Sequence, residues 1–400
     1  MIRPLLLTIL IATFSGVLPV QGMEPERESD SISAEGPIIG VLLSAGIFDG
    51  SIEAESGALI VNWRGGQVSV ASPLTFQAAE EALRLGDRWF REPVRVRASR
   101  GDMQIGHRSH EGWVEWLPDT NLAGGWKMIE RLPMERYLIG VVSREMSAST
   151  FPAAALEAQA VAARTYCYFH YLTGHPTRRY HVYGDTRSQA YGGTARVPQK
   201  VIDAVKRTEG MILLAAGQIF ESFYHSTCGG QTSSAADAFG IAEISTMPSV
   251  SCSGCEGSKY YRWTLQSDRS AVRRALQDIC EGTGVKVGVV NQLIPIETAS
   301  SGHVPYLKVV HSAGSFEVDS QRLRSALSSS RRAESHHQSR LRSSRFQVRV
   351  RAEGFLFEGS GWGHGVGMCQ VGARGYALRG ANRTWILQHY YPGVQIRRMW

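Results

Sequence analysis

The stretch LIGVVSREMSASTFPAAALEAQAVAARTYCYFHYL, residues 138–172, contains two helical runs separated by a short turn. Apolar residues recur at positions 138, 141, 142 and 146, which is the spacing of one helix face, and Glu145 stands on that same face. After the turn, Pro152 opens an alanine-rich run that continues to Tyr166, and proline suits the first turn of a helix. The pattern predicts two helices, the second with side chains small enough for other backbone to approach closely.

Two glutamates in this stretch are expected in opposite electrostatic settings. Glu157 falls in the first turn of the second helix, where the helix dipole stabilises the anion. Glu145 falls in the last turn of the first helix, on the face expected to be buried, and both effects raise the pKa of its carboxyl. A general acid that works near neutral pH needs such a shift. The alternative for Glu145 is a structural ion pair with a neighbour such as Arg164, because structural pairs perturb pKa values too.

The N-terminus has the pattern of an export signal. A basic start is followed by an apolar run and by small residues up to Gly22, which predicts a signal peptide over residues 1–22, or an anchor if it stays uncleaved. Residues 23–35 are predicted to be a disordered lead-in. We therefore expect an exported protein of the periplasm or cell envelope, with membrane contact only through this segment if it is retained.

The composition favours a wall polymer over a nucleic acid as partner. The formal net charge is +7 over 400 residues, a modest balance that suits an anionic wall polymer or a membrane surface. No segment resembles a basic recognition helix or an RNA-binding aromatic signature. We therefore expect no nucleic-acid partner.

The order of patterns along the chain predicts an α+β protein. Short β-type runs fill residues 36–127, a β-rich N-terminal region. Residues 128–400 are expected to form one catalytic domain with a helical core packed with antiparallel sheets. Within it, residues 321–345 are dominated by Ser, Arg and His, which predicts a solvated loop.

The cysteines suggest a metal site. His225 and Cys228 stand three residues apart, and Cys252 and Cys255 follow at the same spacing, which supplies four ligands in the manner of a zinc ribbon. A four-ligand site of this kind would be closed and structural. The alternative is a disulfide, which an exported protein permits. The sequence favours zinc, because a disulfide would leave His225 without a role.

A glycine-rich segment, GSGWGHGVGMCQ at residues 359–370, precedes the C-terminal helices. Alternating glycines remove one face of side chains, so that backbone or a ligand can approach. The segment does not fit a dinucleotide fingerprint, because Val366 stands where the third glycine is required. His364 and Gln370 are its polar groups, and we expect them to contact a polar ligand.

Five segments together resemble the SpoIID/LytB family of bacterial cell-wall proteins, known from sporulation and division. They are GVVSREM (140–146), LEAQAVAARTY (156–166), residues 188–193, HSTCGGQT (225–232), and residues 361–372 with HYYPG (389–393). The resemblance runs from about residue 128 to the C-terminus. Two departures stand out: Ser147 replaces a proline common in the family, and the loop over residues 180–191 lacks the cysteine of a metal site held there by some sporulation members.

The resemblance implies a lytic transglycosylase that cuts the MurNAc–GlcNAc bond of peptidoglycan strands already stripped of stem peptides. Glu145 matches the family's catalytic glutamate. It would protonate the glycosidic oxygen and then act as base on the C6 hydroxyl of muramic acid, closing a 1,6-anhydro ring without a second carboxylate. The residues expected to line the glycan cleft are Gln159, Arg164, Gln189, Tyr191, Ser226, His364 and Gln370.

Two other functions compete with this one. LytB-type members are thought to be non-catalytic wall-binding partners that enhance an N-acetylmuramoyl-L-alanine amidase, so a cell-wall amidase is a possible partner. A zinc amidase is disfavoured, because four soft ligands leave no open position on the metal for water or substrate.

Overall fold

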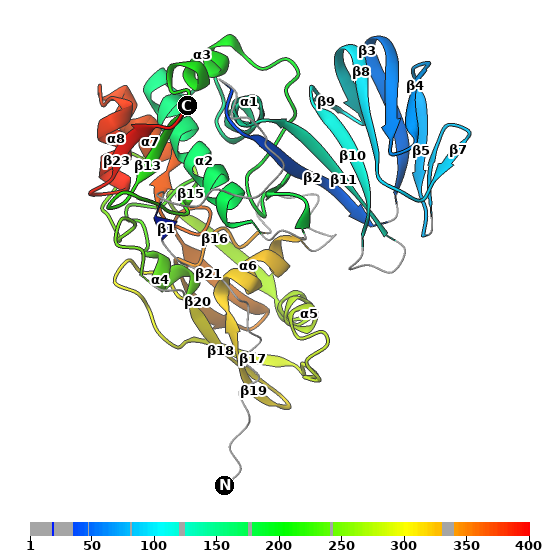
Figure 1. The fold of residues 1–400 in the computed structure, drawn as a ribbon. Coiled ribbons are helices and arrows are strands. Elements are labelled where there is room, and N and C mark those ends of the chain that lie inside the picture. Colours follow the sequence, from blue (N-terminus) through cyan, green and yellow to red (C-terminus); the bar gives the residue numbers. More distant parts are fainter. Residues whose placement is uncertain are drawn as a thin grey trace.

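The computed structural model describes residues 18–19, 35–46, 48–80, 82–119, 125–174, 178–240, 243–329 and 340–400. Figure 1 shows a sheet built by the N-terminal part of the chain, a group of helices beside it, and a lower lobe of strands and helices. Each has its own hydrophobic core. The chain is thus a mixed α/β protein. The predicted signal peptide and lead-in lie almost entirely outside the described residues, and none of the described helices has the length and apolar character that a membrane span requires.

The N-terminal region is β-rich, as predicted. An 11-stranded sheet has the order β12-β2-β11-β10-β8-β3-β5-β6-β7, with β4 on β3 and β9 on β8. Apolar side chains alternate into its core, where Trp116 and Trp126 are buried. The strands are β2 (Ile38–Gly46), β3 (Phe48–Trp63), β4 (Gly66–Val70), β5 (Leu74–Ala78), β6 (Leu83–Leu85), β7 (Arg88–Phe90), β8 (Val94–Ile105), β9 (Arg108–His110), β10 (Trp113–Asp119), β11 (Gly125–Pro133) and β12 (Val182–Tyr183).

The two predicted helices form directly after this sheet. They are α1 (Met134–Glu145) and α2 (Ala153–Thr173), and α3 (Gln199–Arg207) packs against both. Pro152 is the N-cap of α2, whose alanine-rich part is buried. Glu157 therefore lies one turn inside α2 rather than in its first turn, and its carboxylate pairs instead with Arg207 and Arg383, at 2.6 and 2.9 Å.

The end of the chain returns to α2. Helices α7 (Gln370–Leu378) and α8 (Arg383–Tyr390) both pack on it. Strand β15 (Tyr224–His225) pairs in parallel with β22 (Met368–Cys369), which brings the glycine-rich segment onto this helical body. The remaining short elements here are β1 (Leu18–Pro19), β13 (Met211–Leu214), β14 (Gln218–Ile219), α4 (Ala235–Phe239) and β23 (Gln395–Arg398).

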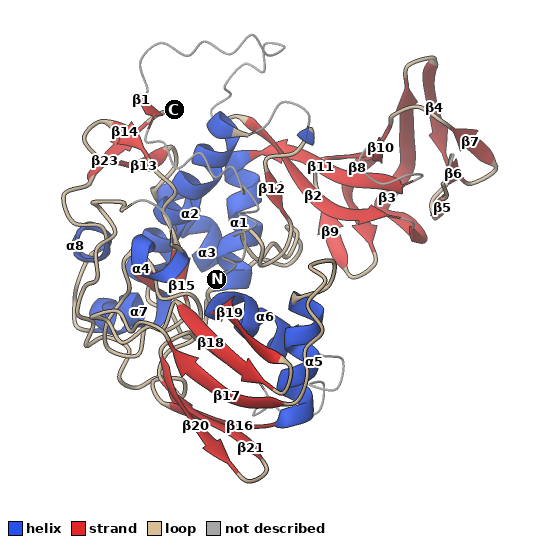
Figure 2. Ribbon diagram, turned by 90° about the horizontal axis from the view of Figure 1, so that it is seen from below, coloured by secondary structure: helices blue, strands red, loops and turns tan. Residues whose placement is uncertain are grey.

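The lower lobe contains two three-stranded antiparallel sheets, β16-β21-β20 and β17-β18-β19, and Figure 2 shows them beside the helices α5 and α6. The predicted Ser/Arg-rich loop at 321–345 is wrong over its first part, where α6 is helical because Leu323 and Leu327, four residues apart, are both buried. Residues 330–339 lie outside the described residues. The elements are β16 (Trp263–Asp268), α5 (Arg269–Ile279), β17 (Val290–Pro295), β18 (Tyr306–His311), β19 (Gly314–Asp319), α6 (Ser320–Ser329), β20 (Phe346–Arg351) and β21 (Gly354–Gly359).

A candidate active site at the C-terminal end of helix α1

Glu145, the last residue of α1, is half-buried in a cleft of about 840 Å³. The cleft lies between the helical body and the lower lobe: β15, the loop after β12, and the glycine-rich segment line it on one side, and α6 and residues 340–342 on the other. Glu145 is the only acidic residue among the described residues that line it. Three residues that the sequence predicted for the cleft do line it: Ser226, His364 and Gln370.

The Glu145 carboxyl is held by neutral hydrogen-bond donors. The backbone N–H of Ala190 donates to Oε1 at 2.9 Å, and Nε2 of Gln370 donates to Oε2 at 3.0 Å. The Tyr224 hydroxyl supplies a third hydrogen bond. Burial raises the pKa of the Glu145 carboxyl and outweighs these three bonds, which lower it. The shift has the predicted direction, and desolvation is its main cause.

Gln159 and Gln189 lie beneath the cleft rather than in its wall. Gln159 is fully buried, and its Oε1 is 3.4 Å from Nε2 of Gln370. Gln189 donates to the hydroxyl of Tyr224 at 3.0 Å, which leaves the hydroxyl proton of Tyr224 free to point at Glu145. Both glutamines therefore orient groups that hold Glu145 and would not touch a ligand themselves.

Arg164 and Tyr191 were wrongly predicted to line the cleft. Arg164 is fully buried and forms two short bonds to Glu135, at 2.7 and 2.6 Å, so it is not the ion-pair partner of Glu145 either. The buried Tyr191 hydroxyl bonds Glu130 of strand β11 at 3.0 Å. Both side chains point into the core, because Arg164 stands on the buried face of α2 and Tyr191 on the buried side of its loop. A motif match does not reveal the direction of a side chain.

His364 is a neutral structural group in the cleft wall. Its Nδ1 accepts from the N–H of Val366 at 3.1 Å, so the proton sits on Nε2, which donates to the carbonyl of Tyr224 at 2.9 Å. Burial holds the pKa of His364 well below its usual range. Both nitrogens are thus engaged, and the ring packs between Phe223 and Phe239. It fixes β15 and therefore Tyr224.

Sequence reasoning missed Tyr224, the Ala190 amide and four arginines. Tyr224 directly precedes the HSTCGGQT segment, a position that could have signalled it. The arginines are Arg187 in the loop after β12, and Arg324, Arg340 and Arg342 from the lower lobe. Arg324, Arg340 and Arg342 lie in the Ser/Arg-rich run, whose composition predicts a solvated loop that could touch an anionic polymer but does not indicate which arginines line a cleft. These four side chains give the cleft a cationic wall.

The predicted metal ligands are only partly brought together. The Sγ atoms of Cys228, Cys252 and Cys255 lie with Sγ of Cys369, all within 4.8 Å of one another and all buried. His225 is outside this group, and its Nδ1 is 3.0 Å from the carbonyl of Val366. The prediction of His225 is therefore corrected to Cys369, because the pairing of β15 with β22 brings a distant cysteine to this point.

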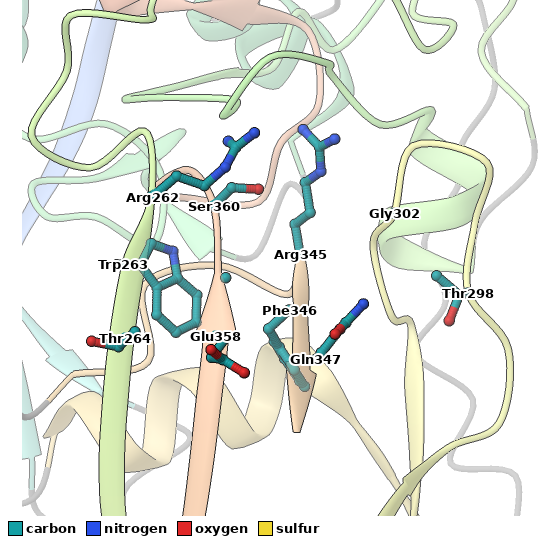
Figure 3. A pocket seen from close by; sticks show the side chains of 11 residues that line it. Arg262, Trp263, Thr264, Thr298, Gly302, Arg345, Phe346, Gln347, Glu358 and Ser360 are labelled. Carbon is teal, nitrogen blue, oxygen red and sulfur yellow. The ribbon is translucent and has the colours of Figure 1, made fainter. Parts of the chain in front are cut away.

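A second cavity, of about 690 Å³, lies in the lower lobe and holds none of the predicted site residues. Figure 3 shows Trp263, Phe346, Gln347 and Glu358 in its wall, with the guanidinium groups of Arg262 and Arg345 at one end. None of the described residues that line this cavity also lines the Glu145 cleft.

Comparison with known protein families identifies the helical body. A family of stage II sporulation proteins, SpoIID, matches residues 123–214, the segment that carries Glu145. An uncharacterised protein of Brachyspira hyodysenteriae is 30% identical over 269 residues, which cover 67% of this chain and 68% of that protein. Stage II sporulation protein D of Bacillus subtilis is 28% identical over 282 residues, which cover 67% of this chain and 75% of that protein. The chain belongs to the SpoIID family.

The rest of the cleft lies outside the matched SpoIID segment. Residues 247–367, which include the lower lobe, match a domain of unknown function (DUF8618). This domain supplies Arg324, Arg340 and Arg342, so the SpoIID segment provides Glu145 and Arg187, and the second domain provides the other three arginines of the cationic wall. A more distant relative, the amidase enhancer of Bacillus subtilis, is 25% identical over 296 residues, which cover 65% of this chain and 40% of the enhancer.

Proposed function

We propose that this SpoIID protein is a peptidoglycan lytic transglycosylase in which Glu145 is the general acid and then the general base. The observation that carries the proposal is a single carboxyl in a large cleft, bonded by neutral donors and with a raised pKa. Such a carboxyl retains a proton at a higher pH than an exposed glutamate does, and it can give up that proton to a substrate oxygen.

One carboxyl is sufficient for this reaction. The proton of Glu145 goes to the glycosidic oxygen as the bond from that oxygen to C1 of muramic acid breaks through an oxocarbenium-like transition state. The resulting carboxylate takes a proton from the C6 hydroxyl, whose oxygen bonds to C1 and closes the 1,6-anhydro ring. Glu145 is protonated again, and no water is consumed. The donors from Ala190, Gln370 and Tyr224 stabilise the transient carboxylate.

The cationic wall supports strands without stem peptides as the substrate. Removing a stem peptide leaves a free lactyl carboxylate on each muramic acid, so a denuded strand is polyanionic. Arg187, Arg324, Arg340 and Arg342 line the cleft and suit such a polymer. The sporulation proteins among the relatives suggest cell-wall remodelling in sporulation or division, and export to the cell envelope would bring the protein to this substrate.

The test is product analysis on denuded and intact glycan strands. We expect wild-type protein to cleave denuded strands and leave 1,6-anhydro ends, which mass spectrometry distinguishes from hydrolysed ends by the mass of one water. Glu145→Gln is expected to lower cleavage by about 10²- to 10⁴-fold, and Glu53→Gln, at an exposed glutamate of the N-terminal sheet, to leave it unchanged. Reducing ends without the anhydro ring, or full cleavage by Glu145→Gln, contradict the proposal.

A second candidate function is favoured by the similarity to an amidase enhancer. A non-catalytic partner would bind glycan without turnover and would stimulate an N-acetylmuramoyl-L-alanine amidase through its surface. The discriminating measurement is amidase activity on whole peptidoglycan with added wild-type or Glu145→Gln protein. Stimulation that survives the substitution, with no anhydro product from wild type, favours the enhancer.

A further inference from the structure

We infer that Cys228, Cys252, Cys255 and Cys369 bind one zinc ion as a closed tetrathiolate site, and that its fourth ligand positions Gln370 beside Glu145. A tetrahedral zinc ion with bonds of about 2.3 Å to sulfur places its ligands at about 3.8 Å from one another. The four Sγ atoms here all lie within 4.8 Å of one another. A multinuclear iron–sulfur cluster would hold its cysteines further apart, so the geometry fits a single ion.

The surroundings of Cys369 suit a thiolate. Its sulfur caps the N-terminus of α7 and accepts from the N–H of Gly372 at 3.2 Å and from the N–H of Cys228 at 3.3 Å. Backbone donors and the positive end of a helix dipole stabilise a negative sulfur. The hydroxyl of Tyr390 lies 3.1 Å from Sγ of Cys252 and can donate to it. These are the outer-shell contacts that a metal-bound cysteine needs.

Positive charge lies beside the cluster. A zinc ion with four thiolates has a net charge of −2, which is costly to bury without compensation. Nη1 of Arg345 donates to the carbonyl of Gly229 at 2.9 Å, and Nη1 of Arg262 donates to the same oxygen at 3.1 Å. Figure 3 shows both guanidinium groups extending in the same direction from the starts of β16 and β20, the two outer strands of one sheet. They place two cations against the backbone that follows Cys228.

The packing of three glycines brings the sulfurs together. A Cβ at Gly254, within the Cys252–Cys255 turn, would lie 2.3 Å from the carbonyl oxygen of Gly372, and one at Gly375 would lie 1.9 Å from the carbonyl oxygen of Gly254. A Cβ at Gly372 would lie 2.6 Å from Sγ of Cys252. The turn therefore rests directly on the first turns of α7. A disulfide would use only two of the four thiols, so it would not require the Cys252–Cys255 turn to pack this closely against α7.

The site joins three segments at the point where the catalytic carboxyl is held. Cys228 follows β15, Cys252 and Cys255 form a turn, and Cys369 ends β22. The next residue, Gln370, donates to Glu145. Loss of the ion would free the start of α7 and with it this donor. All four positions on the metal are filled by protein, so the ion is structural and leaves no position for water or substrate.

Metal content of the purified full-length chain tests the site independently of any catalytic activity. We expect one zinc per chain by mass spectrometry of metals, and, after exchange for Co²⁺, the strong sulfur-to-cobalt absorption of a tetrathiolate. Cys369→Ser is expected to lose the zinc. His225→Ala and Cys280→Ser are expected to keep it, because neither residue belongs to the cluster.

Several outcomes would overturn the inference. Zinc retained by Cys369→Ser but lost by His225→Ala would restore the ligand set predicted from the sequence. No zinc in the wild type, with a disulfide among these cysteines in unreduced peptides, would remove the metal altogether. The zinc content and the disulfide mapping are both measured on the wild-type protein, so neither depends on whether a variant folds. If zinc is present and glycan is not cleaved, the metal site stands and the proposed transglycosylase activity fails.

Discussion

The two ends of helix α1 carry two glutamates with opposite settings. Glu135, in the first turn, accepts two bonds from the buried guanidinium of Arg164, one from the N–H of Gly210 at 3.1 Å and one from Nε1 of Trp400 at 3.2 Å. Glu145, at the last position, has neutral donors and an open cleft. Glu135 is a structural group bonded to a buried cation at the N-terminal end of the helix, whereas burial beside neutral donors leaves Glu145 able to hold a proton.

The largest expected effect is a loss of glycan cleavage without a loss of folding stability. Glu145→Gln should lower glycan cleavage by about 10²- to 10⁴-fold, the usual contribution of general acid–base catalysis. Because burial raises the folded-state pKa of Glu145, the stability that this group contributes is present below its unfolded pKa and is lost as pH rises through the folded pKa. Thermal denaturation of the variant near neutral pH should therefore show equal or higher stability than wild type. A clear loss of stability would mean that Glu145 is structural, like Glu135.

The second expected effect is a loss of folding stability. Glu135→Gln leaves the Arg164 guanidinium buried without its counter-charge, which should lower the free energy of unfolding by about 3–5 kcal/mol. Urea denaturation measures this change. The matched control is Glu157→Gln, because Arg207 and Arg383 are partly exposed and can be solvated, so a smaller loss is expected. Equal losses in the two variants would contradict the distinction between a buried and a solvated pair.

The pH profile of cleavage sharpens the comparison. Cleavage requires protonated Glu145, so the rate should fall as pH rises through its raised pKa. Gln370 and Tyr224, together with the charge of Arg144, lower that pKa. Gln370→Leu removes one of these effects, so the alkaline limb should move upward by about one pH unit, the equivalent of one hydrogen bond. Gln67→Leu, at an exposed site, is the control, and a downward shift would contradict the assignment.

The smallest expected effect is a change in KM, and it tests whether the cleft arginines neutralise the glycan or Glu145. If Arg324 acts on the glycan, Arg324→Gln should raise KM a few-fold on denuded strands, and the difference should shrink at high salt. Arg322→Gln is the matched control, because Arg322 is exposed and bonds the carbonyl of Ile279 outside the cleft. An unchanged KM with a shifted alkaline limb would show that Arg324 acts on Glu145, in the way that Arg164 acts on Glu135.

Features that depend on residues close together in the sequence were predictable, and features that depend on distant residues were not. The two helices of residues 138–172 and the raised pKa of Glu145 were predictable, because apolar spacing and position along a helix are local properties. The helical conformation of α6 was missed, because two buried leucines in a Ser/Arg-rich run are a weak signal. The role of Arg164 was missed for a different reason: its partner, Glu135, is 29 residues away and lies on a neighbouring helix.

The proposed metal ligands show the same limit. Three cysteines were identifiable from their spacing, because they belong to two short turns. The fourth, Cys369, is 114 residues beyond Cys255 (369 − 255) and reaches the cluster through the parallel pairing of β15 with β22. His225 had the right chemistry and spacing, but its ring is engaged with Val366.

The sequence by itself determined which carboxyl is the candidate acid, because the place of Glu145 on α1 follows from periodicity, and it determined that three cysteines at metal-ligand spacing lie near residues 228–255. Only the tertiary structure decided what holds Glu145: Tyr224, Ala190 and Gln370 meet it from three other segments, and a second domain supplies three of the four cleft arginines. The physical reason is that helix periodicity acts within a few residues, whereas desolvation and hydrogen bonding depend on which distant segments pack together.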